Sequence, residues 1–525
     1  MIIFVPTNPE PMQTFSRIAA AVPRVWLADV DKNQSEILSL MHEAAGRGVQ
    51  LLVFPPDALT GATCGSLFRQ ELLRERREAA AEEIRQEAAR LGIRVFLDGR
   101  DGPVEGIAIR REARAEEVTG YRFLRANLAA ESKGMVLLYC SSGYGESTQD
   151  GVYAGSALIF RDGRLLAENP RFRRSSTLLV ADLGAEGTPV APYVPQTGSR
   201  SPFVADDPDE RALRCEEVFA IQTTALCARL EHIRCRTALV GISGGLDSTL
   251  ALLVCCAAFD ALGIPRENIH AVTMPGFGTS GRTHGNAWQL MEKLGTTPRE
   301  IPIAEAVSGH FKDIGQDPSL RDVTFENAQA RERTQILMDL SNRLGGIVVG
   351  TGDLSEIALG WCTYNGDHMS MYNVNGGVPK TLMQTIVSWA AQGPFSAVGD
   401  VLRDIVATPI SPELTPTDAE GNIHQKTEDI IGPYELHDFF LYHLVRHGRR
   451  PAAILTRAKD AFAGIYGEEE IKKWLKTFLK RFFSQQFKRS CSADGPKVGS
   501  VSLSPRGAWT MPSDASAALW LSDLD

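Results

Sequence analysis

Short apolar segments alternate with longer segments of helical periodicity along most of this 525-residue chain. Two helical segments are expected in the first part, Ser35–Arg47 and Glu71–Arg90. Strands are expected at Leu51–Phe54, Ile93–Leu97, Met135–Cys140, Ser156–Phe160 and Thr177–Ala181. Because helices and strands that alternate in this way bury their apolar faces against one another, the pattern predicts layered α/β domains.

The alternation is interrupted between Gly187 and Glu210, where Pro, Gly, Ser and Asp predominate and periodicity is weak. We predict a linker there, with one domain over residues 1–205 and a second over residues 206–525. In the second domain, strands are expected at Thr237–Ile242, Ile269–Met274 and Ile347–Gly350, and helices at Ser248–Leu262, His284–Leu294 and Glu326–Leu344. Repeated strand–helix pairs predict a mainly parallel, doubly wound sheet, in which ligands bind beyond the carboxyl ends of the strands.

Composition excludes several classes of protein. Apolar residues make up 43% and charged residues 23% of the chain, as in a globular protein rather than a disordered one. The net charge of −9 disfavours nucleic acid as a partner. The longest apolar run, Leu250–Phe259, is too short to span a membrane, and Met1–Pro6 lacks the features of a signal peptide. Nine cysteines without a CxxC pattern indicate reduced thiols, so we expect a cytoplasmic location.

The strongest motif is Ser243-Gly244-Gly245-Leu246-Asp247-Ser248, which lies where an expected strand turns into an expected helix. Glycines there let backbone N–H groups approach an anion, and the helix N-terminus adds positive partial charge. The two serines can donate to phosphate oxygens, and Asp247 can hold Mg²⁺. Because the lysine of a Walker loop is absent, the motif instead resembles the pyrophosphate loop of ATP pyrophosphatases.

A second interpretation of the same residues is the G-x-S-x-G nucleophile elbow of a serine hydrolase, with Ser243 as nucleophile. Such an enzyme needs an acidic residue and a histidine after the last strands, and no such pair stands out. A protein that binds nucleotides without catalysis is a further alternative, although it would not need magnesium ligands.

Downstream motifs resemble those of NAD synthetase, and the resemblance runs almost continuously from about Glu210 to Ala515. They are Thr273–Thr279, Glu326–Arg331, Gly350–Glu356, Tyr364–Asp367, Val378–Thr381, Gln425–Asp429, Phe487–Ser490 and Asp494–Gly499. The last two are similar to the long, glutamine-dependent branch of that family. The resemblance implies a sheet of the adenine-nucleotide α-hydrolase type.

The resemblance implies Mg²⁺-dependent amidation of deamido-NAD to NAD through an adenylated intermediate, with AMP and pyrophosphate as products. ATP would be bound by Gly241, Ile242, Ser243, Gly244, Gly245, Leu246, Asp247, Ser248 and Thr351. Deamido-NAD would be bound by Asn327, Glu356, Trp361 and Lys488, and Mg²⁺ by Asp247 and Glu356. Asp247, Asp367 and Lys380 would be catalytic. The resemblance also implies a homodimer or larger homo-oligomer.

The first domain resembles a nitrilase-like glutaminase, an α/β sandwich, over Ala19–Gly61 and again over Gly145–Thr148 and Ala157–Ile159. Glutaminases of this kind use a Glu, a Lys and a Cys. Pro56 stands where the family has the glutamate, and Asp57 beside it is shorter. The stretches that would carry the lysine and the cysteine are missing between Gly92 and Arg125, and Cys64 and Cys140 match positions that are not nucleophilic.

We therefore hypothesise that the first domain is truncated and has lost glutaminase activity. The nitrogen donor would then be ammonia, free or supplied by a separate glutaminase. A functional glutamine-dependent NAD synthetase is the alternative.

Two weaker features favour ordinary packing. Ile471–Phe483 alternates basic with apolar residues, which indicates a helix docked on the protein rather than on a membrane. His443 and His447 have the spacing of zinc ligands on a helix, but no third ligand accompanies them.

Overall fold

The computed structural model describes residues 15–99, 101–278, 281–408 and 427–525. Met1–Pro6, Thr279, Gln425 and Lys426, all used above, lie outside these ranges. The chain divides into two compact units, the first formed by residues 1–147 and 152–195 and the second by residues 148–151 and 196–525. The change of unit at residue 195 falls ten residues before the predicted boundary, and four residues of the first segment belong to the second unit.

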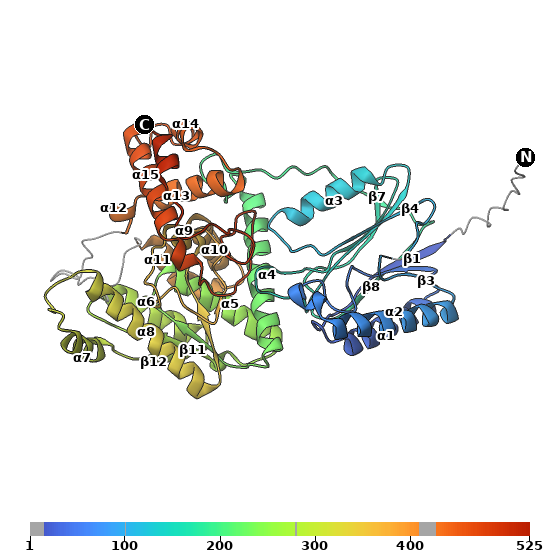
Figure 1. Ribbon diagram of the computed structural model, residues 1–525, viewed down its shortest axis with the longest axis horizontal. Coiled ribbons are helices and arrows are strands. Elements are labelled where there is room, and N and C mark those ends of the chain that lie inside the picture. Colours follow the sequence, from blue (N-terminus) through green and yellow to red (C-terminus); the bar gives the residue numbers. More distant parts are fainter. Residues whose placement is uncertain (1–14, 100, 279–280, 409–426) are drawn as a thin grey trace, which may run out of the picture. The chain divides into compact units, whose positions relative to one another are not determined.

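The first unit contains three α-helices and nine strands in its described part (Figure 1). The helices are α1 (Val30–Gly46), α2 (Glu71–Leu91) and α3 (Gly120–Glu131). The strands are β1 (Arg17–Val22), β2 (Leu51–Val53), β3 (Arg94–Phe96), β4 (Ile107–Glu112), β5 (Val136–Ser141), β6 (Ala157–Arg161), β7 (Arg164–Glu168), β8 (Thr177–Asp182) and β9 (Thr188–Pro189).

The strands of the first unit form two sheets, with orders β3-β2-β1-β8 and β4-β5-β6-β7-β9. Strand β1 shows why they are layered, since successive side chains point to opposite faces. Ile18 and Ala20 pack with Leu138 and Ile159 between the sheets, whereas Ala19 and its neighbours pack against α1 and α2. Helix α3 covers the outer face of the second sheet. The predicted α/β sandwich is confirmed.

The second unit contains fourteen α-helices and five strands in its described part. The strands are β10 (Ala238–Gly241), β11 (Ile269–Thr273), β12 (Thr297–Glu300), β13 (Ile347–Gly350) and β14 (Tyr372–Asn373). The helices are α4 (Pro208–His232), α5 (Leu246–Leu262), α6 (Gly281–Lys293), α7 (Ala304–Ile314), α8 (Val323–Leu344), α9 (Leu354–Leu359), α10 (Lys380–Gln392), α11 (Gly399–Ala407), α12 (Thr427–Ile431), α13 (Tyr434–Leu441), α14 (Pro451–Ala461), α15 (Glu468–Ser484), α16 (Gln486–Arg489) and α17 (Ala518–Ser522).

The sheet of the second unit is parallel throughout its described strands and has the order β12-β11-β10-β13-β14. The chain runs outward from β10 to β12 and then returns to the other side of β10. Because parallel crossovers are right-handed, this reversal puts helices on both faces of the sheet. It also opens a crevice beyond the carboxyl ends of β10 and β13, where doubly wound folds bind ligands. The doubly wound prediction is confirmed.

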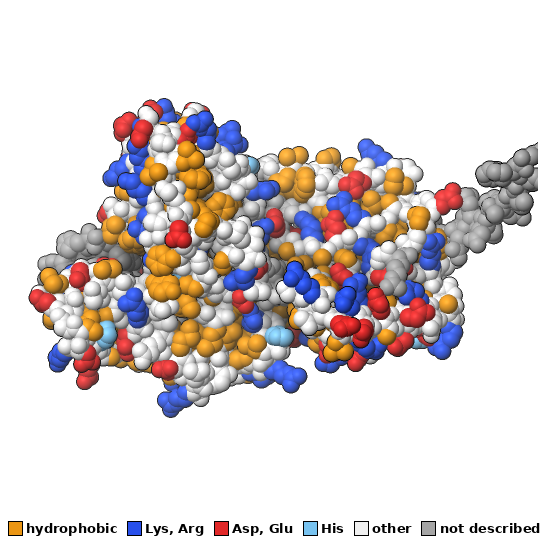
Figure 2. Space-filling view, in the orientation of Figure 1, with side chains coloured by type: hydrophobic (Ala, Val, Ile, Leu, Met, Phe, Trp, Pro, Cys, Tyr) orange, Lys and Arg blue, Asp and Glu red, His pale blue; other side chains and the backbone are white. Residues whose placement is uncertain are grey.

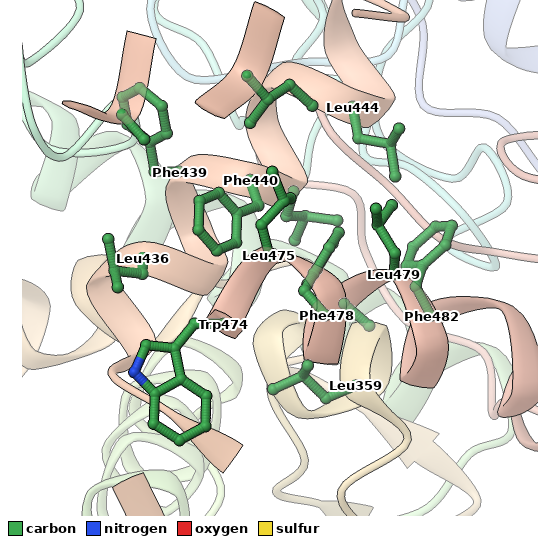
Figure 3. Packing of buried hydrophobic residues seen from close by; sticks show 14 of the residues in the cluster. Leu359, Leu436, Phe439, Phe440, Leu444, Trp474, Leu475, Phe478, Leu479 and Phe482 are labelled. Atoms are coloured by element: carbon green, nitrogen blue, oxygen red, sulfur yellow. The ribbon is translucent and has the colours of Figure 1, made fainter. Parts of the chain in front are cut away.

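A large apolar core lies among the C-terminal helices (Figure 3). Phe440 of α13 meets Leu475 and Phe478 of α15, and Trp474 and Phe482 continue the apolar face of α15. This packing confirms that Ile471–Phe483 is a docked helix. Among the described residues, His443 and His447 belong to no cluster of potential metal ligands.

Several expectations about elements were wrong. The predicted linker Gly187–Glu210 contains β9 and the start of α4, whose first turn is fixed by Asp207 as N-cap and Pro208 at the first helical position. The first helix begins at Val30 rather than Ser35, because Asp29 caps it through the backbone N–H of Lys32. Such caps are short polar signals, which the apolar periodicity does not register.

Figure 2 shows that Lys and Arg are interspersed with Asp and Glu on the visible face, without a single large basic patch. Within the described ranges, no helix combines the length and apolar character needed to cross a membrane.

Candidate functional site

The loop between β10 and α5 folds back on itself around two serine hydroxyls. The Oγ atoms of Ser243 and Ser248 lie 3.2 Å apart, and the N–H of Gly245 donates to the Oγ of Ser243 at 3.1 Å. Gly244 has φ of +90°, and a side chain there would collide with the carbonyl of Thr283. This conformation therefore requires glycine. The partners of Ser243 are a hydroxyl and backbone groups rather than a histidine, which does not support a nucleophile elbow.

Asn375 joins this loop to the loop after β13. Its buried side chain donates from Nδ2 to the carbonyls of Asp247 at 2.9 Å and of Thr351 at 3.0 Å. The Nε2 of Gln222 donates in turn to the Oδ1 of Asn375 at 3.0 Å. The two loops that carry the predicted ATP-binding residues are thus held together by one side chain, which the sequence analysis did not single out.

A buried lysine meets three carboxylates at the same edge of the sheet. The Nζ of Lys380 lies 2.7 Å from Asp247, 2.5 Å from Asp353 and 3.0 Å from Glu356, measured to the nearest carboxylate oxygen. Lys380 is 2% exposed and Asp353 is fully buried. Sequence reasoning brought Asp247, Glu356 and Lys380 forward but missed Asp353, although it lies in the motif Gly350–Glu356.

Local structure explains why these groups converge. Asp353 is the N-cap of α9 and accepts the N–H of Glu356 at 2.9 Å, so both face one end of that short helix. Lys380 begins α10, and its N–H donates to the Oγ of Ser355 at 2.9 Å. Asp438 accepts hydrogen bonds from Ser355 and from the N–H of Thr381. These hydrogen bonds hold the starts of α9 and α10 next to each other, so that Asp353, Glu356 and Lys380 meet.

The electrostatics of the cluster favour a cation. Burial lowers the pKa of Lys380, but the three carboxylates outweigh it and raise the pKa well above its usual value. Burial is also the main cause that raises the pKa of Asp353, and it raises the pKa of Glu356 to about 7. The raised pKa values mean that one ammonium is not enough to keep all three groups ionised in a desolvated place, whereas a bound divalent cation would favour their ionised forms. Carboxylate oxygens of Asp247, Asp353 and Glu356 lie within 4.8 Å of one another, and such hard oxygen donors suit Mg²⁺.

A pocket opens beside the cluster. Three predicted site residues line it, namely Glu356, Asp367 and Lys488. The N–H of Thr363 donates to the Oδ1 of Asp367 at 2.7 Å, and burial raises the pKa of Asp367. The Nζ of Lys488 donates to the carbonyls of Gly360 and Cys362 at 2.8 and 2.6 Å.

Two other predicted residues, Asn327 and Trp361, do not line this pocket. Asn327 of α8 accepts a hydrogen bond from the hydroxyl of Thr363 at 2.8 Å, so it adjoins the segment that carries Asp367. Trp361 does not line the pocket. Its ring packs under the guanidinium of Arg481 at 5.1 Å and against the C-terminal core, where it has a structural role in this conformation.

Comparison with known proteins agrees with this architecture. A family model described as NAD synthase matches residues 219–473. The structure of a glutamine-dependent NAD(+) synthetase from Cytophaga hutchinsonii superimposes with a TM-score of 0.78 at 17% identity, covering 98% of this chain and 100% of the other. That of an enzyme of the same description from Acinetobacter baumannii gives a TM-score of 0.62 at 17% identity, covering 94% of this chain and 100% of the other. At 17% identity the two structures show that the fold is shared, namely an α/β sandwich unit followed by a doubly wound unit.

Curated relatives are more similar in sequence. The glutamine-dependent NAD(+) synthetase of Mycobacterium leprae is 40% identical over 447 residues, covering 74% of this chain and 66% of the relative. That of Mycobacterium tuberculosis is also 40% identical, over 449 residues and with the same coverage. The chain belongs to the glutamine-dependent NAD synthetase family. It spans just under two thirds of the length of these relatives.

Proposed function

We propose that this protein is a ligase that forms NAD from deamido-NAD, with ATP consumed and AMP and pyrophosphate released. The buried cluster of Asp247, Asp353, Glu356 and Lys380 beside a pocket is the observation that carries the proposal. Family membership supports the same conclusion.

The reaction explains why such a cluster is useful. A carboxylate is a poor acyl donor because its leaving group would be oxide, whereas an adenylate leaves readily as AMP. The nicotinate carboxylate attacks the α-phosphate of ATP and expels pyrophosphate, and ammonia then displaces AMP. Positioning and neutralisation of phosphate charge are the main catalytic tasks.

Each element of the site has a part in this scheme. The loop of Ser243 to Ser248 offers N–H groups and hydroxyls to the ATP phosphates, and Thr351 contacts ATP from the neighbouring loop. Asp247, Asp353 and Glu356 would hold Mg²⁺, which neutralises phosphate charge when it is bound. Lys380 neutralises part of the charge of these carboxylates, and its ammonium would also neutralise phosphate charge of a bound ATP.

The pocket would receive the dinucleotide. Lys488 and Asn327 bind deamido-NAD, and Asp367 faces the nicotinate and the incoming ammonia. Trp361 contacts deamido-NAD only after a change of rotamer, since its ring is now packed with Arg481.

Two nitrogen donors are candidates. The names of the curated relatives favour glutamine, because all of those compared are described as glutamine-dependent. Local features of the first unit support ammonia instead. Pro56 has no carboxylate, and Asp57 is paired with Arg77 at 3.2 Å.

Arg111, Cys64 and Cys140, three further polar groups of this unit, are engaged in structural contacts. Arg111 of β4 donates to the carbonyls of Phe54 and Pro55 at 2.6 and 3.0 Å, and to those of Leu97 and Asp98 at the end of β3. Burial raises the pKa of the Cys64 thiol, and it raises that of Cys140 to about 12. Neither thiol is suited to nucleophilic attack at neutral pH.

Steady-state assays with deamido-NAD, ATP and Mg²⁺ test the proposal. Formation of NAD, AMP and pyrophosphate in equal amounts supports it, and their absence with either nitrogen donor refutes it. Efficient turnover with NH₄⁺ and none with glutamine supports the ammonia reaction. Comparable turnover with glutamine establishes the glutamine-dependent alternative. Labelling of Ser243 by an active-site phosphonate, with no need for Mg²⁺, would indicate a serine hydrolase.

The assembly is also part of the proposal. We expect a homodimer or a larger homo-oligomer, which light scattering coupled to gel filtration measures directly. A separate glutaminase would supply ammonia in the cell if the first unit does not.

A further inference from the structure

One thiol of the second unit lies against an imidazole at the wall of the pocket. The Sγ of Cys491 is 3.4 Å from the Nε2 of His368, and His368 lines the pocket next to Asp367. The same Sγ lies 3.3 Å from the carbonyl of Lys488, a second residue of the lining. The thiol is therefore one contact away from two residues that face the ligand.

The tautomer of His368 follows from its other nitrogen. The Nδ1 lies 3.0 Å from the carbonyl of Thr363, and since a carbonyl only accepts, Nδ1 carries the hydrogen. The Nε2 then presents a lone pair to the thiol. The ring stacks on Tyr364 with centroids 5.3 Å apart, which fixes its plane. Burial lowers the pKa of His368, so the ring is neutral at neutral pH and its Nε2 can accept the thiol proton. The imidazolium is disfavoured, however, and lasts only until the leaving thiolate takes the proton.

This setting distinguishes Cys491 from the other thiols. Burial raises the pKa of six of them, Cys64, Cys140, Cys215, Cys255, Cys256 and Cys362. Cys491 is only partly buried. Cys235 is a matched comparison, because it is also partly buried and also contacts two carbonyls, of Thr237 and Gly345, whereas no imidazole of the described residues hydrogen-bonds to its thiol.

We propose that Cys491 is a site of reversible thiol modification that closes the neighbouring pocket. The co-reactant is a small disulfide. The Cys491 proton passes to Nε2 of His368, and the thiolate sulfur attacks one sulfur of the disulfide. A new S–S bond forms, the old one breaks, and the leaving thiolate takes the proton from His368. Electrons balance, because one disulfide is exchanged for another.

The added group has a direct effect on the pocket wall. A substituent on Sγ needs the space that now separates it from His368 and from the carbonyl of Lys488. Either the imidazole or the segment of Lys488 must move, and both line the cavity. The effect on NAD formation rests on the proposed function, whereas the reactivity of the thiol does not.

Labelling of the full-length protein with 4,4′-dithiodipyridine at pH 7 tests the reactivity, with peptide mass spectrometry to assign the modified thiol. We expect Cys491 to react about tenfold faster than Cys235. Cys491→Ser removes the fast phase, and Cys235→Ser leaves it unchanged. His368→Gln, which lacks the base, slows the phase toward the rate of Cys235. Equal rates for Cys491 and Cys235, or an unchanged rate in His368→Gln, would overturn the proposal.

A second readout measures the closure. Protein modified at Cys491 should lose at least tenfold in NAD formation and recover it with dithiothreitol, whereas Cys491→Ser keeps its activity throughout. Saturating deamido-NAD should slow the labelling of Cys491 but not of Cys235. Full NAD formation by the protein modified at Cys491 would overturn the proposal that the modification closes the pocket. If no variant forms NAD at all, the proposed function has failed, and the labelling rates still decide whether the pair is reactive.

Discussion

The carboxyl ends of strands in the two units are occupied by buried or partly buried charges with opposite consequences. In the second unit, Lys380 leaves the three carboxylates around it only partly neutralised. In the first unit, the guanidinium of Arg111 is engaged by four carbonyls at the ends of β2 and β3. In both units a charge is removed from water, which costs free energy. In the second unit the charged groups form the candidate binding site, whereas in the first unit the charged group ties two strand ends together.

The comparison teaches how to distinguish an active cluster from a structural one. Charge that the local hydrogen bonds do not balance favours a ligand, whereas charge fully engaged by backbone groups stabilises the chain. Five substitutions, besides their controls, and one pH measurement test this distinction.

Removal of Lys380 should have the largest effect. Lys380→Met leaves the buried Asp353 and the partly buried Asp247 and Glu356 without their cation, and we expect the free energy of unfolding to fall by about 3–5 kcal/mol. Urea denaturation of the original protein and of Lys380→Met measures this loss of stability. Lys459→Met, which removes an exposed pair with Glu468, should cost less than about 1 kcal/mol. Equal losses of unfolding free energy in Lys380→Met and Lys459→Met would contradict the inference that the carboxylates of the cluster depend on Lys380.

Asp247→Asn should lower NAD formation by about a hundredfold, or ~3 kcal/mol, because it removes a proposed Mg²⁺ ligand beside the proposed phosphate loop. Thermal unfolding should change little. Asp260→Asn is the control on the same helix, since Asp260 pairs with Arg266 near the surface. A similar loss of activity in both variants would mean that α5 as a whole, rather than Asp247, is affected.

Arg111→Leu should destabilise the first unit by about 2–3 kcal/mol, because four carbonyls lose their donor. Its neighbour Arg110 makes exposed pairs with Glu112 and Glu131, so Arg110→Leu should cost less than about 1 kcal/mol. Ammonia-driven NAD formation should be unchanged in both. An intact free energy of unfolding in Arg111→Leu would show that the guanidinium is not structural.

Acid should weaken the C-terminal core through His437. Burial lowers the pKa of His437 to about 4, whereas an unfolded histidine has a pKa of about 6.5. Between these values only the unfolded state binds the proton, so stability falls as the pH decreases from about 6.5 toward 4. We expect a loss of about 1–2 kcal/mol by pH 5. Denaturation across this range should give a flatter profile for His437→Gln.

The smallest effects concern Cys64→Ala and Cys140→Ala, which should change NAD formation less than twofold with either nitrogen donor. Both thiols are buried, and their carbonyl partners hold them in the core. Loss of glutamine-driven activity in either variant, with ammonia-driven activity intact, would identify a working nucleophile in the first unit.

Much of the architecture could be predicted from apolar periodicity, because β10, β11 and β13 are short apolar runs that precede or follow long helices. The proposed phosphate loop was equally visible, since Ser243 to Ser248 are adjacent in sequence. Asp353 and Asn375 were harder to recognise. Each acts through contacts with residues distant in the chain, and nothing in their own neighbourhood distinguishes a buried ligand from an ordinary cap or turn.

The side chain of Asn375 has a mechanical consequence. Because it binds the carbonyls of both Asp247 and Thr351, it fixes the separation of the two loops, and the proposed nucleotide site would have its width before any ligand arrives. Little conformational entropy remains to be lost there on binding. Adjustment to the proposed substrates would therefore come from the wall of the pocket where Lys488 and His368 lie.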